Sequence, residues 1–176
     1  MKSKKAIVWV STVLYILIGM AVMGMLLAVI RPKISEMRDS LTIDQTVESL
    51  NKFDEIVLRT RQATGERLSY ELLLSRGEFS INGINEKIIW TIDDSAYRKS
   101  QEGVVVKLGN IEVLTEKNGN LWRITLTRDY SASKLNITVI GKDTDRVLTV
   151  AKIPYTIFVE NKGLVDNKQH LDIVIE

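Results

Sequence analysis

The sequence predicts an α+β protein in which a long N-terminal helix precedes and packs on an antiparallel β-sheet head. Two observations support this fold class. A long uncharged run that starts at Ala6 is followed by apolar residues at helical spacing, whereas from Arg67 onward apolar and polar residues alternate. The length of 176 residues suits one domain with an appended helix rather than several independent cores.

The composition excludes most kinds of catalytic site. The chain has no cysteine and one histidine, so disulfides, thiol nucleophiles, cysteine-ligated metals and multi-histidine metal sites are all excluded. The net charge of +2 provides no general attraction to nucleic acid. No glycine-rich phosphate loop or nucleophile elbow is present either. We therefore expect neither an enzyme nor a cofactor.

The uncharged run at residues 6–30 predicts a membrane-spanning helix. Its 25 residues would extend roughly 37 Å, enough to cross a hydrocarbon core of ~30 Å. Its thirteen Val, Ile and Leu residues favour insertion by on the order of 4–8 kcal/mol. The run is also longer than the apolar region of an ordinary cleaved signal peptide, which is about 7–15 residues.

Basic residues before this run indicate its orientation. Lys2, Lys4 and Lys5 precede the apolar segment and favour a cytoplasmic N-terminus, although Arg31 and Lys33 follow on the other side. We therefore expect a single-pass membrane protein whose head lies outside the cytoplasm.

The pattern becomes amphipathic over residues 31–65. Pro32 should either bend the helix or start a new one, and Gly65 should end it. Apolar residues recur mostly at steps of three or four, which predicts one helix face packed on the head. These residues are Ile34, Met37, Leu41, Val47, Leu50, Phe53 and Val57.

The pattern of residues 66–176 predicts an antiparallel β head. Apolar residues alternate with polar ones in successive short segments, as in strands with one buried face. Asn118-Gly119 between two such segments predicts a tight hairpin. Asn82-Gly83 and Asn161-Lys162-Gly163 predict further turns.

The order of these parts resembles that of archaeal type IV pilin-like proteins. The matching parts are Lys4-Lys5-Ala6, the apolar run, its amphipathic continuation and the β head, with local likeness at residues 77–81, 120–126 and 159–163. The resemblance implies that residues 1–6 are a short leader, cut by a prepilin-peptidase-like enzyme between Ala6 and Ile7. It also implies that residues 7–30 assemble with copies of the chain or other pilin-like subunits through a pilus assembly machinery.

Two functions therefore remain open. The first is a structural subunit of an archaeal type IV pilus-like surface filament, assembled through the apolar helix. Gly24 and Ala28, four residues apart, would let another helix approach closely in such an assembly. The second is a membrane-anchored extracytoplasmic binding or accessory protein that does not polymerise.

A few residues in the head resemble functional sites. Asn136-Ile137-Thr138 is an N-glycosylation sequon whose Asn136 is predicted on the polar face of a strand. His170 has no carboxylate at a useful spacing, which favours a structural role. Asp93-Asp94 and Asp143-Thr144-Asp145 lack the remaining ligands of a calcium loop, so we expect them in turns.

Overall fold

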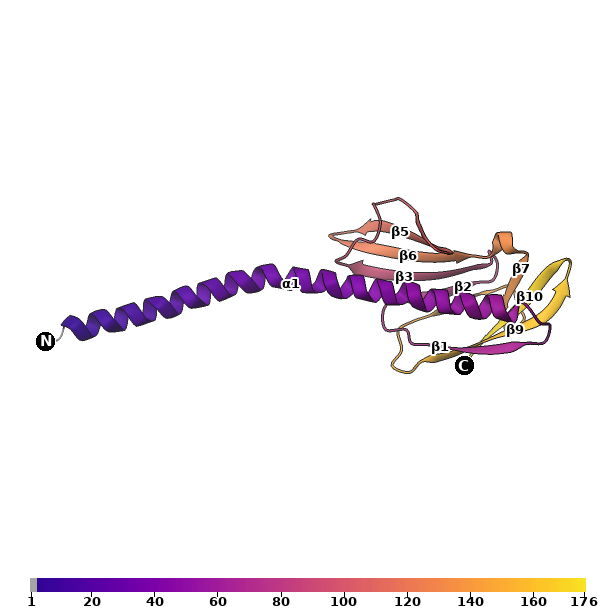
Figure 1. The fold of residues 1–176 in the computed structure, drawn as a ribbon, viewed down its shortest axis with the longest axis horizontal. Coiled ribbons are helices and arrows are strands. Elements are labelled where there is room, and N and C mark those ends of the chain that lie inside the picture. Colours follow the sequence, from indigo (N-terminus) through magenta and orange to yellow (C-terminus); the bar gives the residue numbers. More distant parts are fainter. Residues whose placement is uncertain (1–2) are drawn as a thin grey trace.

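The computed structural model describes residues 3–176, with side chains described from Trp9 onward, and its fold is α+β. A single helix, α1 (Ser3–Thr60), projects far beyond a head made of β-strands (Figure 1). Met1 and Lys2 of the predicted leader lie outside the described residues. Strands and one short 3-10 helix form the rest of the chain: β1 (Arg67–Leu72), β2 (Glu78–Asn82), β3 (Lys87–Ser95), β4 (Val106–Leu108), β5 (Ile111–Asn118), β6 (Leu121–Asp129), η1 (Ser131–Ser133), β7 (Leu135–Val139), β8 (Asp145–Leu148), β9 (Tyr155–Val165) and β10 (Lys168–Ile175).

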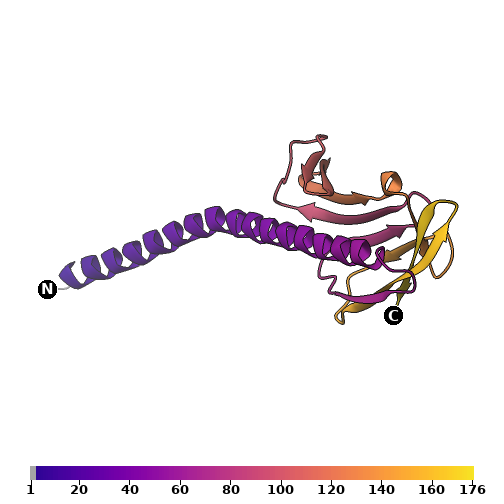
Figure 2. The same ribbon diagram turned by 45° about the vertical axis from the view of Figure 1, so that its right-hand side comes forward.

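The helix runs through Pro32 without a break, which rules out the new-helix alternative and leaves the bending alternative. Proline has no N–H to donate to the carbonyl of Ala28, and its ring crowds that carbonyl, which favours a bend. The ribbon changes direction near the middle of α1 (Figure 2). The helix then ends at Thr60, earlier than the predicted stop at Gly65. Gly65 instead donates its N–H to the carbonyl of Asn161 at 2.8 Å.

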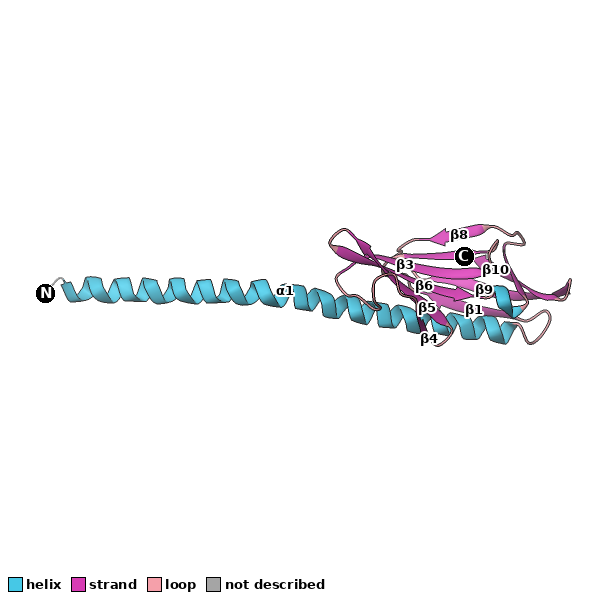
Figure 3. Cartoon of the chain, turned by 90° about the horizontal axis from the view of Figure 1, so that it is seen from above, coloured by secondary structure: helices cyan, strands magenta, loops and turns pink. Residues whose placement is uncertain are grey.

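The strands form two sheets. One has four strands in the order β1-β9-β10-β7, and the other has six in the order β4-β5-β6-β3-β2-β8. The second half of α1 contacts β1 and β9 of the first sheet and β3, β5 and β6 of the second. Figure 3 shows this half of the helix running along the strands while the first half extends away from them. The helix is thus a shared support for both sheets.

The prediction that every strand pair is antiparallel is wrong for one pair. β10 pairs with β7 in parallel, with Leu171 opposite Ile137. These strands are not adjacent in the sequence, so no hairpin links them and no local turn signal fixes their direction. Every other strand pair within the two sheets is antiparallel over the described residues.

Two predicted turns are confirmed and one is wrong. Asn82-Gly83 ends β2 before a turn, and the Asn118-Gly119 hairpin joins β5 to β6 with Asn118 opposite Leu121. Asn161-Lys162-Gly163 instead lies inside β9, where Asn161 is opposite Leu171 and Gly163 is opposite His170. Lys162 is therefore the extra residue of a β-bulge.

The turn that closes the β9–β10 hairpin is Asp166-Asn167. Both residues have positive φ, 50° and 61°. A two-residue turn with both central residues in this region is a type I′ turn, for which Asp and Asn are favoured.

The prediction that one apolar face of the helix is buried on the head is correct for only part of that face. Leu50, Phe53 and Val57 are buried as expected, but Ile34, Met37 and Leu41 are more than half exposed. The cause is helical phase: the nine residues from Leu41 to Leu50 correspond to 2.5 turns at ~3.6 residues per turn, so these side chains point in opposite directions. Ile43, which the pattern missed, is fully buried in place of Leu41.

Replacing Leu50 by Asp should destabilise the head far more than the same change at Leu41. Leu50 is 1% exposed and Leu41 is 62% exposed. Leu50→Asp buries an unpaired carboxylate and should lower the free energy of unfolding by about 3–5 kcal/mol. Leu41→Asp should cost about 1 kcal/mol or less. Denaturation of the full chain in detergent measures both, and equal losses would contradict the observed helix phase.

Candidate functional site: the exposed apolar helix and its junction with the head

The N-terminal half of α1 is the largest exposed apolar surface among the described residues. All residues described from Trp9 to Ile30 are exposed. Among the described residues, α1 is the one helix long and apolar enough to cross a membrane, with a mean hydropathy of 2.7 in its most apolar window. A soluble monomer rarely leaves a patch of this size uncovered, so the helix is a site for membrane or protein contact.

The small residues of this helix have open space beside them. A side chain built at Gly24 would meet no atom within 4 Å, so the chain's own head does not occupy this face. Ala28 is also exposed, one turn further along. Ala6 and Ile7 lie within α1, but their side chains lie outside the described residues, so the predicted cleavage junction remains a prediction.

The second half of the helix is attached to the head by a cluster of aromatic and aliphatic side chains. Phe53 is at its centre, with edge-on ring contacts to Tyr70 at 5.5 Å and to Phe79 at 5.8 Å between ring centroids. Phe79 in turn packs edge-on against Trp90 at 5.6 Å. Tyr70 also donates a hydrogen bond from its hydroxyl to the helix carbonyl of Ser49 at 3.0 Å. The contact therefore joins the helix to strands of both sheets.

A buried carboxylate fixes the point where the helix first meets the head. Asp39 is 6% exposed, forms an ion pair with Arg76, and accepts a hydrogen bond from the backbone N–H of Ala96 at 2.6 Å. Arg76 donates further hydrogen bonds to the carbonyls of Asp93 and Asp94. Removing Arg76 would leave the buried Asp39 carboxylate without its charged partner, so this contact favours one position of the helix along its axis.

A second buried carboxylate, Asp54, lies about four turns further along the helix. Its two oxygens accept hydrogen bonds from Arg128 Nε at 2.7 Å and Asn110 Nδ2 at 3.0 Å. The Arg128 guanidinium also lies 4.5 Å from the ring centroid of Tyr130. Burial, and next the charge of Asp54, raise the pKa of the Tyr130 hydroxyl well above its usual value.

Asn161 holds the C-terminal end of the helix. Its side-chain amide donates to the carbonyls of Thr60 at 2.9 Å and Arg61 at 3.2 Å. Its side-chain oxygen accepts from the N–H of Gly163 at 2.9 Å and from Gln169 Nε2 at 2.5 Å. The carbonyls at a helix end have no partner within the helix, so this buried asparagine supplies one from the β-bulge of β9. The bulge thus positions a residue that ends α1.

Sequence reasoning missed Asp39, Asp54 and Asn161 as residues that position the helix. For the two aspartates a signal was present: they share one helix phase with Ile43, Leu50 and Val57, so charged residues recur on the face that the head covers. For Asn161 the local pattern predicted only a turn. Its partners Thr60 and Arg61 are about a hundred positions earlier in the chain, so no local signal could indicate them.

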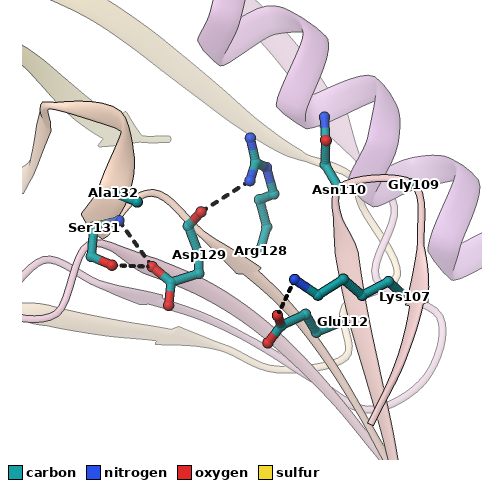
Figure 4. A pocket seen from close by; sticks show the side chains of 8 residues that line it. All are labelled: Lys107, Gly109, Asn110, Glu112, Arg128, Asp129, Ser131 and Ala132. Carbon is teal, nitrogen blue, oxygen red and sulfur yellow. Dashed lines mark hydrogen bonds and ion pairs between the residues drawn. The ribbon is translucent and has the colours of Figure 1, made fainter.

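A polar pocket lies in the head, and its charged side chains are in ion pairs. It has a volume of about 330 Å³ and lies beside η1 (Figure 4). Its charged side chains are already in ion pairs: Lys107 with Glu112 at 3.2 Å, Arg128 with Asp54, and Asp129 with Lys87 at 3.0 Å. Burial tends to raise the pKa of Asp129, but hydrogen bonds from Ser131 and the Lys87 ammonium outweigh this and lower it.

The Ser131 hydroxyl and N–H both donate to Asp129, at 2.6 and 2.9 Å. This pattern caps the short turn after β6.

The other candidate residues are distributed over the strands. Asn136 is half-buried in β7, and its Nδ2 lies 3.2 Å from Nδ1 of His170 in β10, while Leu135, Ile137 and Val139 of the same strand are buried as predicted. Asp93 and Asp94 lie in an irregularity of β3 rather than in a turn between strands.

Asp143 precedes β8, and Asp145 begins it. Within the part of the chain described, no three His, Asp or Glu side chains come together as a metal site.

Replacing Asn161 by Ala should loosen the helix end. The change leaves the buried carbonyl of Thr60 and the N–H of Gly163 without their partners and should lower the free energy of unfolding by about 2–3 kcal/mol. Asn51→Ala is the control, because Asn51 lies within α1 and does not hold the end of the helix. This change should leave the free energy of unfolding unchanged or slightly raised. Thermal denaturation of the two variants measures the difference. Equal midpoints would show that Asn161 does not hold the helix.

Comparison of the chain with protein-family models, with curated proteins and with solved structures found no match.

Proposed function

We propose that this chain is a structural subunit of a type IV pilus-like filament at an archaeal cell surface, assembled through its N-terminal helix. The observation that carries this proposal is that one continuous helix is fixed in the head at one end, whereas its side chains from Trp9 to Ile30 are exposed and mostly apolar. An anchor needs only enough hydrophobicity to stay in a bilayer. A rigid connection between head and membrane helix is what an assembly needs to transmit a fixed geometry.

Assembly of such helices is physically favourable. When apolar helices leave a bilayer and pack together, their apolar surface stays out of water and their backbone hydrogen bonds stay intact. The partners are then other copies of the chain or pilin-like subunits, with the membrane as the store of unassembled subunits. The head lies outside the cytoplasm and coats the assembly. A prepilin-peptidase-like enzyme would remove residues 1–6 before assembly.

Gly24→Leu tests assembly without harming insertion. The change raises hydropathy, so membrane levels should stay normal, but it fills the open space at Gly24 beside Ala28. We expect incorporation into sheared surface material to fall about tenfold or more, since ~1.4 kcal/mol of lost packing is sufficient for that. Val22→Leu, which enlarges a side chain that is already bulky, is the matched control and should assemble normally.

Ala6→Leu tests processing in the same assay. It should block cleavage and retain Lys2, Lys4 and Lys5, whose charges are costly inside a dry helical core. Mass spectrometry of the native N-terminus shows whether Ile7 comes first. If the native protein keeps Met1 and neither Gly24→Leu nor Ala6→Leu changes its assembly, the filament proposal fails and a non-polymerising membrane-anchored protein is the better account.

A further inference from the structure

The loop between β8 and β9, residues 149–154, presents apolar side chains at the surface of the head. Ile153 is 77% exposed, more than any other large apolar side chain among the described residues, including those of the membrane segment. Val150 in the same loop and Leu73 in the β1–β2 connection are both 56% exposed. Exposed apolar residues that are gathered in one region mark a contact surface, whereas scattered ones do not. We refer to residues 149–154 as the basal loop.

Two hydrogen bonds fix the backbone of the basal loop. The hydroxyl of Tyr155 donates to the carbonyl of Thr149 at 2.9 Å, which ties the two ends of the loop together. The N–H of Ala151 donates to the carbonyl of Leu74 at 3.2 Å, which ties its middle to the β1–β2 connection. Because both contacts hold the loop at the surface, its apolar side chains stay exposed unless something outside the head covers them.

Both charged residues in the segment 146–159 are basic. Arg146 and Lys152 are exposed, and neither forms an ion pair with the residues that the structure describes. The acidic residues Glu71 and Glu176 lie opposite Thr156 of β9, two positions after the loop. The tip of the loop thus combines exposed apolar side chains with an unpaired lysine. Protein surfaces that bind an anionic lipid interface have this combination.

The basal loop lies at the end of the head nearer the membrane segment. Asn161, near the end of β9, contacts Thr60 at the C-terminal end of α1. Tyr70, which pairs with an earlier part of β9, contacts Ser49 of α1 instead. β9 therefore runs along the helix toward the helix C-terminus, and the loop that precedes it lies toward the membrane. Figures 1 and 2 both show this loop on the inner side of the bend in α1.

The length of the membrane segment favours a tilt. Its 25 uncharged residues extend roughly 37 Å, whereas the hydrocarbon core is ~30 Å thick, so a tilt of about 35° keeps all of them in hydrocarbon. Ser49 is 19 residues beyond Ile30, or about 28 Å along the helix, so an upright head would hold the basal loop above the headgroups. A tilt toward the inner side of the bend lowers this side of the head to the membrane surface.

We propose that the basal loop docks on an anionic lipid surface, so that the head of the membrane-inserted chain leans on the bilayer beside its own helix. Val150 and Ile153 enter the interface between headgroups and acyl chains, and Lys152 contacts lipid phosphates. The membrane segment keeps the loop close to the surface, so even a weak contact is populated. The contact needs no second copy of the chain. It applies equally to a filament subunit before assembly and to a membrane-anchored protein that does not polymerise.

A fluorescent label on a single thiol tests the docking, because the chain has no native cysteine. Thr149→Cys places a polarity-sensitive label in the loop and leaves Val150, Lys152 and Ile153 unchanged. The full chain is inserted into vesicles of phosphatidylcholine and phosphatidylglycerol. We expect brominated lipid to lower the emission of this label about twofold or more, since docking for half of the time is sufficient for that. The same label at Ile84→Cys, 65% exposed in the turn after β2, should keep its emission.

Two further changes in the labelled Thr149→Cys chain separate the apolar and charged contributions. Ile153→Ser removes the most exposed apolar side chain, and Lys152→Glu reverses the charge. Both positions are exposed, so the thermal midpoint should stay unchanged, whereas each change should abolish most of the quenching.

Ile84→Ser and Lys142→Glu are the matched controls for these two changes. Both residues lie beside the pair Asn82–Asp145, at the end of β2 and β8 opposite to the one from which the basal loop leaves. These variants should keep full quenching. In vesicles of phosphatidylcholine alone, the quenching of the unmodified loop should fall, because Lys152 then meets no net negative charge.

Three results would overturn the docking. The first is equal emission of the Thr149→Cys label with and without brominated lipid. The second is quenching that neither Ile153→Ser nor Lys152→Glu reduces, because the label itself would then be the group that enters the lipid. The third is a blue-shifted emission that brominated lipid does not quench, which would show that protein covers the loop. None of these results decides the filament proposal, which Gly24→Leu tests separately.

Discussion

The packing of the second half of α1 against two sheets at once is the contact on which the rest of the structure depends. Leu50, Phe53 and Val57 are buried in it, and Phe53 alone contacts rings from β1 and β2. Without the helix, the inner faces of both sheets would lose their shared cover. The chain therefore builds its head around a helix that also extends well beyond the head.

The contact restricts the helix in three ways. Asp39 and Arg76 fix its position along the axis, Asp54 and Arg128 fix its rotation, and Asn161 fixes its end. Such restraints exceed what is needed to tether a head to a bilayer. These contacts fix the rotation of the membrane segment relative to the head. A fixed rotation matters only where the segment packs against a partner of defined geometry. This is the physical reason for preferring an assembly subunit to a simple anchor.

Much of the fold follows from local pattern, and the exceptions have identifiable causes. The apolar run, the β alternation and the Asn118-Gly119 hairpin depend on neighbouring residues, so the sequence predicts them well. The parallel pairing of β7 with β10 and the bulge at Lys162 depend on strands far apart in the chain. The outward direction of Met37 and Leu41 was missed because the six-residue step from Leu41 to Val47 shifts the helix phase.

The residues of the candidate contact surface also fall into those that local sequence indicates and those that only the structure reveals. Gly24 and Ala28 could be selected from spacing alone, since small residues four apart are a local signal. The exposed position of Ile34, Met37 and Leu41 became visible only when the structure showed which face of the helix the head covers. The helix phase of Asp39 and Asp54 places them on the covered face, but nothing local in the sequence indicates that Arg76 and Arg128 are their partners.

Oxidative footprinting of Met37 tests the central claim, that other copies of the chain cover the exposed helix. Met37 is the only methionine between the apolar run and the end of the chain, and no cysteine competes for the oxidant. In chains separated by detergent it should oxidise readily, as expected for a side chain that is 66% exposed. In native surface material the account predicts strong protection of Met37. Equal oxidation of Met37 in separated and native material would contradict it.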